Sequence, residues 1–324
     1  MSKHYLSFDE QIKHLNDDKK ILCNGDQDKE LIIRVGYFNL VNGYKTPFTS
    51  SKDMNGNHIY ARGTTIKEFY ALKKFDDKLR YHLLYYITRV EEEIRTISSY
   101  LFDKENTIKA KTWKSTKAYS KSVERPLLQK LISRMNEEIK LRRNSLEYVD
   151  FYLKNHSPLP TWVVTKAINL GTFINFLKYS PASLKKSFCT LYGLHEDGYF
   201  DETLMIGSLH WMRLIRNSCA HNERIYCISG QGRIVDRYIR KLGKRYWKNI
   251  NRKIFDLLIY MKYYLMHDDY KKFINEIIEM MKDLENQVSA FAFQNIRGNM
   301  GIKKMEDLGW LRESEQYEKD YLKL

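Results

Sequence analysis

The stretch IKEFYALKKFDDKLRYHLLYYITRVEEEIRTISSYL, residues 66–101, decides the fold class of this 324-residue chain. Its apolar side chains recur at steps of three and four residues, which is the spacing of one face of an α-helix. Phe69, Leu72, Leu79, Leu83 and Val90 follow this period. A periodic segment of this length indicates a long core helix.

Helical spacing continues beyond this stretch, and the chain lacks the alternating Val, Ile and Thr runs that are typical of strands. The further segments expected to be helical are about 126–153, 162–179, 201–220, 254–266 and 273–293. Pro126 suits a first helical turn, Pro158 and Pro160 separate two helices, and Pro181 is placed to open another short one. The pattern predicts an all-α bundle.

The two ends of the chain flank the expected helical domain, residues 66–295. Residues 1–65 are expected to form a helical and loop segment, and residues 296–324 a C-terminal tail. Within the first segment, residues 7–16 are amphipathic, with Ser7 as the N-cap and Glu10 completing a capping box. Residues 50–63 are polar and rich in turn formers, which predicts a surface loop.

The balance of charge is strongly basic, with 55 Lys and Arg against 40 Asp and Glu and a formal net charge of +15. A charge of this size favours a polyanionic partner. A basic enzyme that binds no polyanion is the alternative explanation of the same composition. No stretch has the apolar length of a membrane-spanning helix, and the first ten residues lack the apolar region of a signal peptide. We therefore expect a cytoplasmic protein with no membrane partner.

The cysteine pattern gives little support to a metal site. Cys23, Cys189, Cys219 and Cys227 include no C-x-x-C pair, and Cys219 and His221 alone form a weak ligand pattern. No cluster of Asp, Glu and His with ligand spacing is present either. The sequence predicts reduced, mostly buried thiols, neither metal nor cofactor, and it disfavours a metal-dependent nuclease.

Three polar side chains, Arg216, Asn217 and His221, lie close together in the run LIRNSCAH, residues 214–221, at the end of the expected helix 201–220. Histidine suits acid–base work because its unperturbed pKa is about 6.5. Arginine stays charged, and its planar fork fits phosphate oxygens. Asn217 and His221 share a helix face, whereas Arg216 and His221 are about 140° apart around the axis. The trio suits metal-free RNA cleavage. Alternatively, Arg216 is an ordinary charge on the helix surface, and His221 is a cation that the helix dipole favours at the C-terminal end.

Two basic stretches with interleaved aromatic residues are candidate RNA-binding surfaces. The first stretch also contains the aromatic residue Tyr119. A disordered basic surface loop explains this stretch nearly as well as an RNA-binding surface does. Its residues are Lys109, Lys111, Trp113, Lys114 and Lys117. The second would align as one stripe in a helix, which favours phosphate contact over a solvated face. Its residues are Arg233, Arg237, Lys241, Lys244, Lys248 and Arg252.

Five ordered landmarks resemble the abortive-infection (Abi) family of the AbiD/AbiF type. They are RVGYFNLVNGY (34–44), FDDKLR (75–80), VEEEIRT (90–96), LPTW (159–162) with NLGT (169–172), and RNSCAHNER (216–224). The resemblance extends over most of the chain, from about residue 34 to about residue 265. It implies an all-α protein with a HEPN (higher eukaryotes and prokaryotes nucleotide-binding) bundle.

The resemblance also implies a function. Catalytic HEPN proteins carry an Arg, usually followed by a polar residue, and then a His after a short spacer, and Arg216, Asn217 and His221 match this pattern. Such proteins are typically metal-independent endoribonucleases. Members of the AbiF type are similar to toxins of phage defence that a small structured non-coding RNA restrains.

On this basis each residue of the trio has an expected role. His221 is the general acid or base, Arg216 binds phosphate and stabilises the transition state, and Asn217 orients His221 or the substrate. Because one copy supplies one histidine and one arginine, we expect a homodimer with a composite site. The alternative function is that of a HEPN protein that binds RNA without cleaving it, within a ribonucleoprotein.

Overall fold

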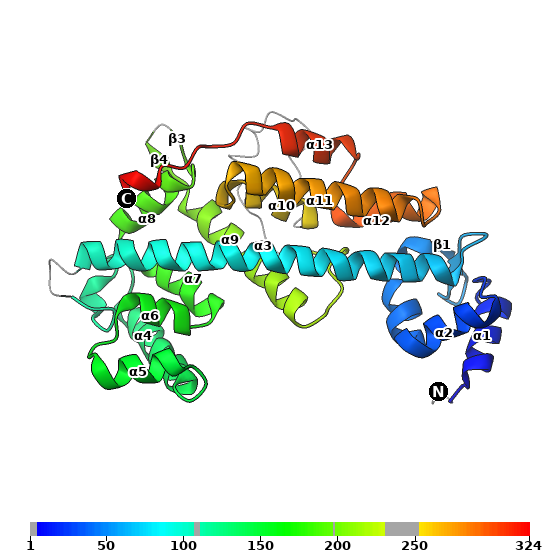
Figure 1. The fold of residues 1–324 in the computed structure, drawn as a ribbon, viewed down its shortest axis with the longest axis horizontal. Helices are drawn as coiled ribbons and strands as arrows, with labels where there is room; N and C mark the ends of the chain where they lie inside the picture. The colour runs from blue at the N-terminus through cyan, green and yellow to red at the C-terminus, as the bar shows by residue number, and fades with distance from the viewer. Residues whose placement is uncertain (1–4, 107–110, 197, 231–252) are drawn as a thin grey trace.

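The computed structural model describes residues 5–106, 111–196, 198–230 and 253–324. The fold is all-α, as predicted, and it is organised around α3 (Ile66–Asn106), which runs along the longest axis of the molecule (Figure 1). At 1.5 Å per residue this helix is about 60 Å long. It continues past the predicted end because Phe102 and Asn106 are also buried.

Two groups of helices lie on opposite sides of α3 (Figure 1). The lower group in this view comprises α4 (Arg125–Arg142), α5 (Glu147–Asn155), α6 (Thr161–Ala167) and α7 (Leu170–Tyr179). The upper group comprises α10 (Ile254–Tyr264), α11 (His267–Glu285), α12 (Ala290–Met300) and α13 (Glu306–Glu313). Between the groups, α8 (Ala182–Leu191) and α9 (Glu202–Ala220) also pack against α3.

The N-terminal region lies at the far end of α3 from α8 (Figure 1). It contains α1 (Phe8–Asp17), α2 (Gly25–Val35), the π-helical turn η1 (Phe38–Asn42) and the 3-10 turn η2 (Thr46–Phe48). The predicted capping box of α1 is confirmed, because the Ser7 backbone N–H donates to Glu10 Oε2 at 2.7 Å.

The strands of the described residues form small antiparallel hairpins, and Leu22 and Thr65 form an isolated parallel bridge. The predicted surface loop at residues 50–63 is partly wrong, because β1 (Thr49–Lys52) pairs with β2 (His58–Tyr60) there. The second hairpin joins β3 (His195–Glu196) to β4 (Tyr199–Phe200). Short 3-10 turns, η4 (Thr116–Ala118) and η6 (Tyr321–Lys323), complete the elements.

Two predicted long helices are each broken into two. The predicted helix 126–153 is interrupted between α4 and α5, where Leu146 adopts an extended conformation and the Ser145 hydroxyl donates to the Arg142 carbonyl. The predicted helix 162–179 is interrupted between α6 and α7, where the Asn169 side chain accepts from the Thr172 backbone N–H at 2.9 Å. Short polar side chains that bond the backbone locally compete with helix continuation, which explains both breaks.

The C-terminal helices also differ from the prediction. The predicted helix 273–293 instead belongs to α11, which begins earlier, and to α12, which Ser289 caps and which extends into the predicted tail. The tail at residues 296–324 further contains α13, whose Leu308 and Leu311 are fully buried. The other predicted helices, 201–220 and 254–266, correspond closely to α9 and α10.

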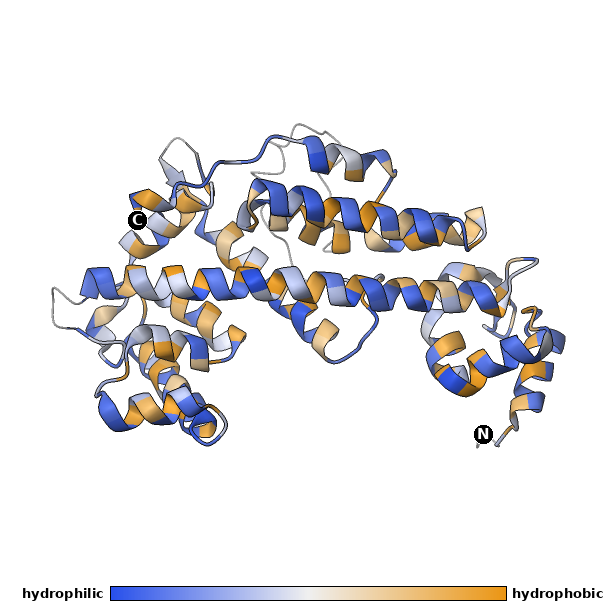
Figure 2. Ribbon diagram, in the orientation of Figure 1, coloured by the Kyte–Doolittle hydropathy of each residue, from blue (hydrophilic) through white to orange (hydrophobic). Residues whose placement is uncertain are grey.

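Apolar packing explains why α3 can lie at the centre of the fold. Hydrophobic residues recur along its whole length (Figure 2), and Phe69, Leu83 and Val90 are among those buried. The four cysteines are free, and three of them are buried, as predicted. Within the described residues no helix combines the length and the apolar character needed to cross a bilayer.

Candidate functional site

The predicted trio lies at the C-terminal end of α9, where the helix closes with a defined cap. Asn222 adopts a left-handed conformation, with φ of 58°. Its N–H donates to the Cys219 carbonyl at 3.2 Å, and the Glu223 N–H donates to the Ser218 carbonyl at 2.9 Å. These two bonds form a Schellman motif, in which asparagine is the commonest substitute for glycine. The motif fixes His221 as the C-cap residue, with φ of −92° and ψ of 9°.

His221 is exposed and lies one turn beyond Asn217. The His221 backbone N–H donates to the Asn217 carbonyl at 2.9 Å, so the helix remains regular up to this point. The two side chains are therefore on one face, about 40° apart around the axis. No side-chain hydrogen bond of His221 occurs within the described residues, which leaves its ring nitrogens open to solvent there.

The side chain of Arg216 points towards α3 and not towards His221. Its Nε lies 3.6 Å from Glu91 Oε2, and its side chain is 38% exposed. Glu91 also accepts from Arg95, one turn along α3, at 2.8 Å and 3.1 Å. The Arg95 guanidinium further donates to the Thr165 carbonyl of α6. Two arginines thus share one carboxylate, which leaves one net positive charge beside the exposed part of Arg216.

Burial and neighbouring charge act on the guanidinium of Arg95. Burial lowers the pKa of Arg95, and the Arg216 charge acts in the same direction, whereas Glu91 opposes both effects.

Cys219 lies between Arg216 and His221 in the sequence, but burial raises the pKa of its thiol to about 12. Cys219 is therefore a protonated packing residue at neutral pH and not a nucleophile.

The segment after His221 is fixed by Asp76, which is completely buried on α3. This carboxylate accepts from the Tyr226 N–H at 2.8 Å, from the Tyr44 hydroxyl at 2.9 Å and from Arg80 at 2.9 Å. Burial raises the pKa of Asp76, and these donors act in the opposite direction. Arg80 also donates to the Glu223 carbonyl at 3.1 Å, so one ion pair holds both sides of the turn.

Glu223 and Arg224 do not pair with each other but bond to different partners. Glu223 accepts from the Ser218 hydroxyl at 2.7 Å, and Arg224 donates to the Gly43 carbonyl. The run Asn42-Gly43-Tyr44 is therefore structural, because it anchors the turn that follows His221.

The five sequence landmarks meet around the C-terminal half of α9. Landmark 34–44 supplies Tyr44, landmark 75–80 supplies Asp76, and landmark 90–96 supplies Glu91. In the fourth landmark, the Asn169 N–H and the Thr172 hydroxyl bond to Glu138 of α4, which positions α7 beside α9. Segments far apart in the sequence thus hold one turn in place.

The first basic stretch lies elsewhere, and its aromatic residue is wrongly assigned. Trp113 is 1% exposed, and its indole N–H donates to the Leu159 carbonyl at 2.8 Å, so no ring face is free for a base. Tyr119 is buried in the same way. Lys114 and Lys117 are exposed and Lys111 is half-buried. The stretch begins beyond the C-terminal end of α3, and this end lies about 22 Å along the helix axis from Glu91.

The remaining predicted RNA-binding residues lie outside the described residues. They are Lys109 of the first stretch and Arg233, Arg237, Lys241, Lys244, Lys248 and Arg252 of the second. Among the residues that the structure describes, no three His, Cys, Asp or Glu side chains form a group able to hold a metal ion.

The sequence alone does not identify the residues that position the trio. Glu91, Arg95 and Asp76 fall within landmarks that assign them no individual role, and no local pattern marks Asn222 as a helix-closing residue. An available signal was the i, i+4 spacing of Glu91 and Arg95, which favours an ion pair on one helix. Their approach to α9 depends on tertiary contacts.

Comparison with known proteins supports the landmarks. No match was found among curated proteins or solved structures. A family model described as "Abi-like protein" matches residues 30–227, which is more than half of the chain and includes all five landmarks. The chain therefore belongs to the Abi-like protein family.

Proposed function

We propose that this protein is a metal-independent HEPN-type endoribonuclease of the AbiD/AbiF type, with Arg216, Asn217 and His221 as its active-site residues. Its family suggests a role in abortive infection, a form of phage defence. The observation that carries the proposal is the placement of an exposed histidine at the C-cap of α9, on one face with Asn217, which the half-exposed Arg216 directly precedes in the sequence.

The chemistry requires a base, an acid and a positive charge. A base takes the proton from a ribose 2′-OH, and the 2′-oxygen then forms a bond to phosphorus. The bond from phosphorus to the 5′-oxygen breaks, and an acid protonates that oxygen. The products are a 2′,3′-cyclic phosphate and a 5′-OH. His221 serves as acid or base, and Arg216 stabilises the charge that develops on the phosphate oxygens.

A homodimer would complete this site, and the geometry of α9 supports that proposal. Arg216 and His221 point about 140° apart on a helix that remains regular up to His221. One copy also supplies one histidine, whereas the reaction uses both an acid and a base. A second copy related by a two-fold axis would supply the second histidine and an arginine facing the first.

Mixing wild type with an inactive variant under conditions of subunit exchange tests the dimer. In a composite site that uses a histidine from each copy, a heterodimer of wild type and His221→Ala lacks one of the two histidines, so excess His221→Ala lowers cleavage below that of the same amount of wild type alone. Light scattering on the same samples measures the oligomeric state. A monomeric wild-type protein that cleaves RNA, or a mixture of dimers that keeps the full activity of its wild-type content, contradicts the composite site.

Cleavage itself is tested with purified protein freed of bound nucleic acid and incubated with RNA in excess chelator. Wild type is expected to give 2′,3′-cyclic phosphate ends, whereas His221→Ala and Arg216→Ala are inactive. His267→Ala is the matched control, because His267 is also exposed but lies at the start of α11. Equal activity of the His221→Ala variant and wild type would refute the assignment.

The competing function is RNA binding without cleavage. The pairing of Arg216 with Glu91 favours it, because this carboxylate partly neutralises the charge proposed to act on phosphate. Tight RNA binding by an inactive wild-type dimer would establish this alternative. For the endoribonuclease we propose a small structured non-coding RNA as the restraining partner, and for the alternative an RNA held in a ribonucleoprotein. Sequencing of the RNA that copurifies with the protein identifies either one.

A further inference from the structure

A cavity of about 690 Å³ lies between α4, α7 and α9, on the helix that carries the proposed active site. It is within the size range of small-ligand pockets, which is roughly 300–1,000 Å³. His210 and Arg213 of α9 line it. On a regular helix these two residues and Asn217 lie within an arc of about 60° around the helix axis. His221 continues the same face about 12 Å beyond Arg213 along that axis.

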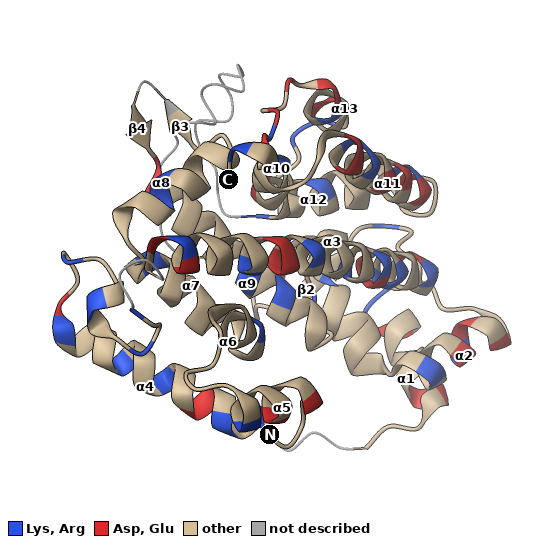
Figure 3. Cartoon of the chain, turned by 60° about the vertical axis from the view of Figure 1, so that its left-hand side comes forward, with Lys and Arg blue, Asp and Glu red and all other residues tan. Residues whose placement is uncertain are grey.

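The cavity carries more positive than negative charge. Its lining includes Lys130, Arg134 and Arg213, and the single lining carboxylate is Glu137. Arg134 pairs with Glu138 at 2.8 Å, whereas Lys130 has no ion pair within the described residues. Figure 3 shows further Lys and Arg residues along α4, which forms one wall.

Arg213 is the most informative lining residue. Its Nε is buried and has no hydrogen-bond partner within the described residues, which is costly for a charged donor. Gly171 lies behind it, because a Cβ there would be 3.5 Å from Arg213 Cδ and 3.2 Å from Asn169 Oδ1. A larger side chain at position 171 would crowd the guanidinium, so the glycine leaves it room. A bound oxyanion would satisfy the guanidinium.

Other lining residues suit a nucleobase and a ribose. Leu127 is 43% exposed, and Tyr179 offers a half-buried ring. Burial lowers the pKa of His210, and the charges of Arg213 and Lys178 act in the same direction. A neutral imidazole both donates and accepts, as hydroxyl and base edges require.

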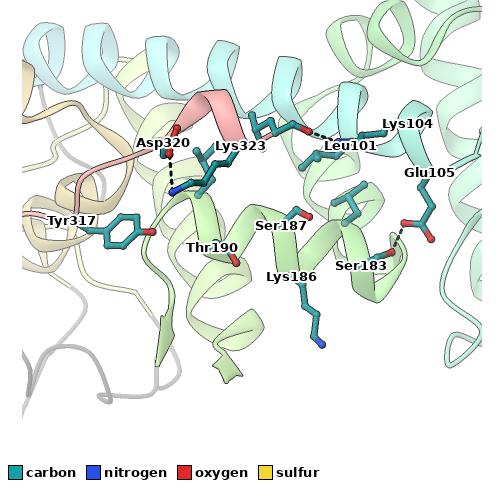
Figure 4. A pocket seen from close by; sticks show the side chains of 13 residues that line it. Leu101, Lys104, Glu105, Ser183, Lys186, Ser187, Thr190, Tyr317, Asp320 and Lys323 are labelled. Atoms are coloured by element: carbon teal, nitrogen blue, oxygen red, sulfur yellow. Dashed lines mark hydrogen bonds and ion pairs between the residues drawn. The ribbon is translucent and has the colours of Figure 1, made fainter. Parts of the chain in front are cut away.

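A second cavity, of about 560 Å³, provides a contrast (Figure 4). It lies between α3, α8 and the C-terminal residues, and its polar groups bond to one another. Lys323 pairs with Asp320 at 2.9 Å, Ser183 donates to Glu105, and Lys104 donates to the Leu324 carbonyl. Most cations of this second cavity are engaged in such bonds. In the cavity beside α9, by contrast, Lys130 has no ion pair and Arg213 Nε no hydrogen-bond partner within the part of the chain that the structure describes.

We infer that the cavity between α4, α7 and α9 binds one nucleotide unit of the RNA strand that reaches the Arg216 and His221 site. A phosphate of this unit contacts Arg213 and Lys130, and its base lies against Leu127 and Tyr179. The inference rests on the proposed function for the identity of the ligand, but binding at the cavity does not require cleavage.

The test measures binding of a fluorescent single-stranded RNA of about ten nucleotides, a length within the range of known single-strand sites. Methylation of every 2′-oxygen prevents cleavage. Arg213→Gln is expected to weaken binding about tenfold, the effect of losing a charged hydrogen bond. It should also lower the slope of log affinity against log salt by about 0.7. Lys130→Gln should weaken binding less, about threefold, because Lys130 is exposed.

Lys140→Gln is the matched control, because it removes the same charge from α4 outside the cavity. The inference is overturned if Arg213→Gln and Lys130→Gln bind like Lys140→Gln, or if 5′-AMP binds as tightly as the oligonucleotide. Should Arg213→Gln fail to fold, the exposed Lys130 still decides the matter.

Failure of the inference and failure of the proposed function are distinguishable. Cleavage of unmodified RNA by wild type together with unaltered binding by the cavity variants refutes the cavity alone. Weakened binding by those variants together with no cleavage by wild type refutes the nuclease and leaves the cavity as an RNA site.

Discussion

At the scale of single residues, the candidate site depends on charges that the fold brings together. Glu91 of α3 lies between Arg95 and Arg216, and its carboxylate is largely shielded from solvent. Removing one member of a buried charged group costs more than the group contributes, because the partners keep their charge without compensation. Glu91 is therefore predicted to be more sensitive to substitution than its exposed neighbours.

The variant Glu91→Gln is expected to lower the free energy of unfolding by about 2–3 kcal/mol. Urea denaturation measures this change. Glu92→Gln is the control, because Glu92 lies on the same helix but is exposed and should change stability by less than about 0.5 kcal/mol. Equal stability of the two variants would show that Glu91 does not hold the arginines.

At the scale of elements, the sequence predicted helices better than their breaks. The apolar period of α3 and α9 extends over many residues, so chance interruptions do not hide it. The breaks before α5 and α7 depend on a few local bonds, such as that of the Asn169 side chain. Such bonds use residues that also occur within helices, and the packing of each helix decides between the two outcomes.

The Schellman motif at the end of α9 gives a prediction about Asn222. A left-handed residue costs an ordinary side chain roughly 1–2 kcal/mol, and glycine avoids this cost. Asn222→Ala is expected to lower stability by about 1 kcal/mol, whereas Asn222→Gly should maintain or slightly raise it. Thermal melting compares the two variants. Equal melting temperatures would contradict the role of Asn222 in closing the helix.

At the scale of the whole molecule, the C-terminal segment connects distant parts of the fold. The side chain of Lys319 is 2% exposed, and its ammonium lies 3.9 Å from Glu93 of α3 and 5.0 Å from the centre of the Tyr192 ring. The Tyr321 and Tyr192 hydroxyls both donate to Glu93 at 2.8 Å. The segment is thus anchored on a face of α3 different from that of Glu91.

Stability should depend on pH through Lys319. Burial lowers the pKa of this ammonium to about 8, whereas the unfolded chain keeps the ordinary value of 10.5. Between these values the unfolded state binds more protons, so stability rises with pH. The free energy of unfolding of wild type should therefore rise by about 2 kcal/mol relative to Lys319→Met between pH 7 and 10.

Urea denaturation of both proteins across this range measures the difference, and other titrating groups cancel in the comparison. Lys323→Met is the control, because the side chain of Lys323 is 84% exposed and should show no such rise. A difference between wild type and Lys319→Met that does not vary with pH would mean that Lys319 is solvated in the folded protein.

The sequence by itself determined the all-α class, the central helix α3 and the position of Arg216, Asn217 and His221 at the end of α9. These features follow from apolar period and from residue spacing within one segment, which are local properties of the chain. Only the tertiary structure decided that Arg216 turns towards Glu91, that Asp76 fixes the turn after His221, and that Trp113 is buried. Each of these depends on contacts between segments far apart in the sequence, and no local pattern specifies which distant partner a side chain meets.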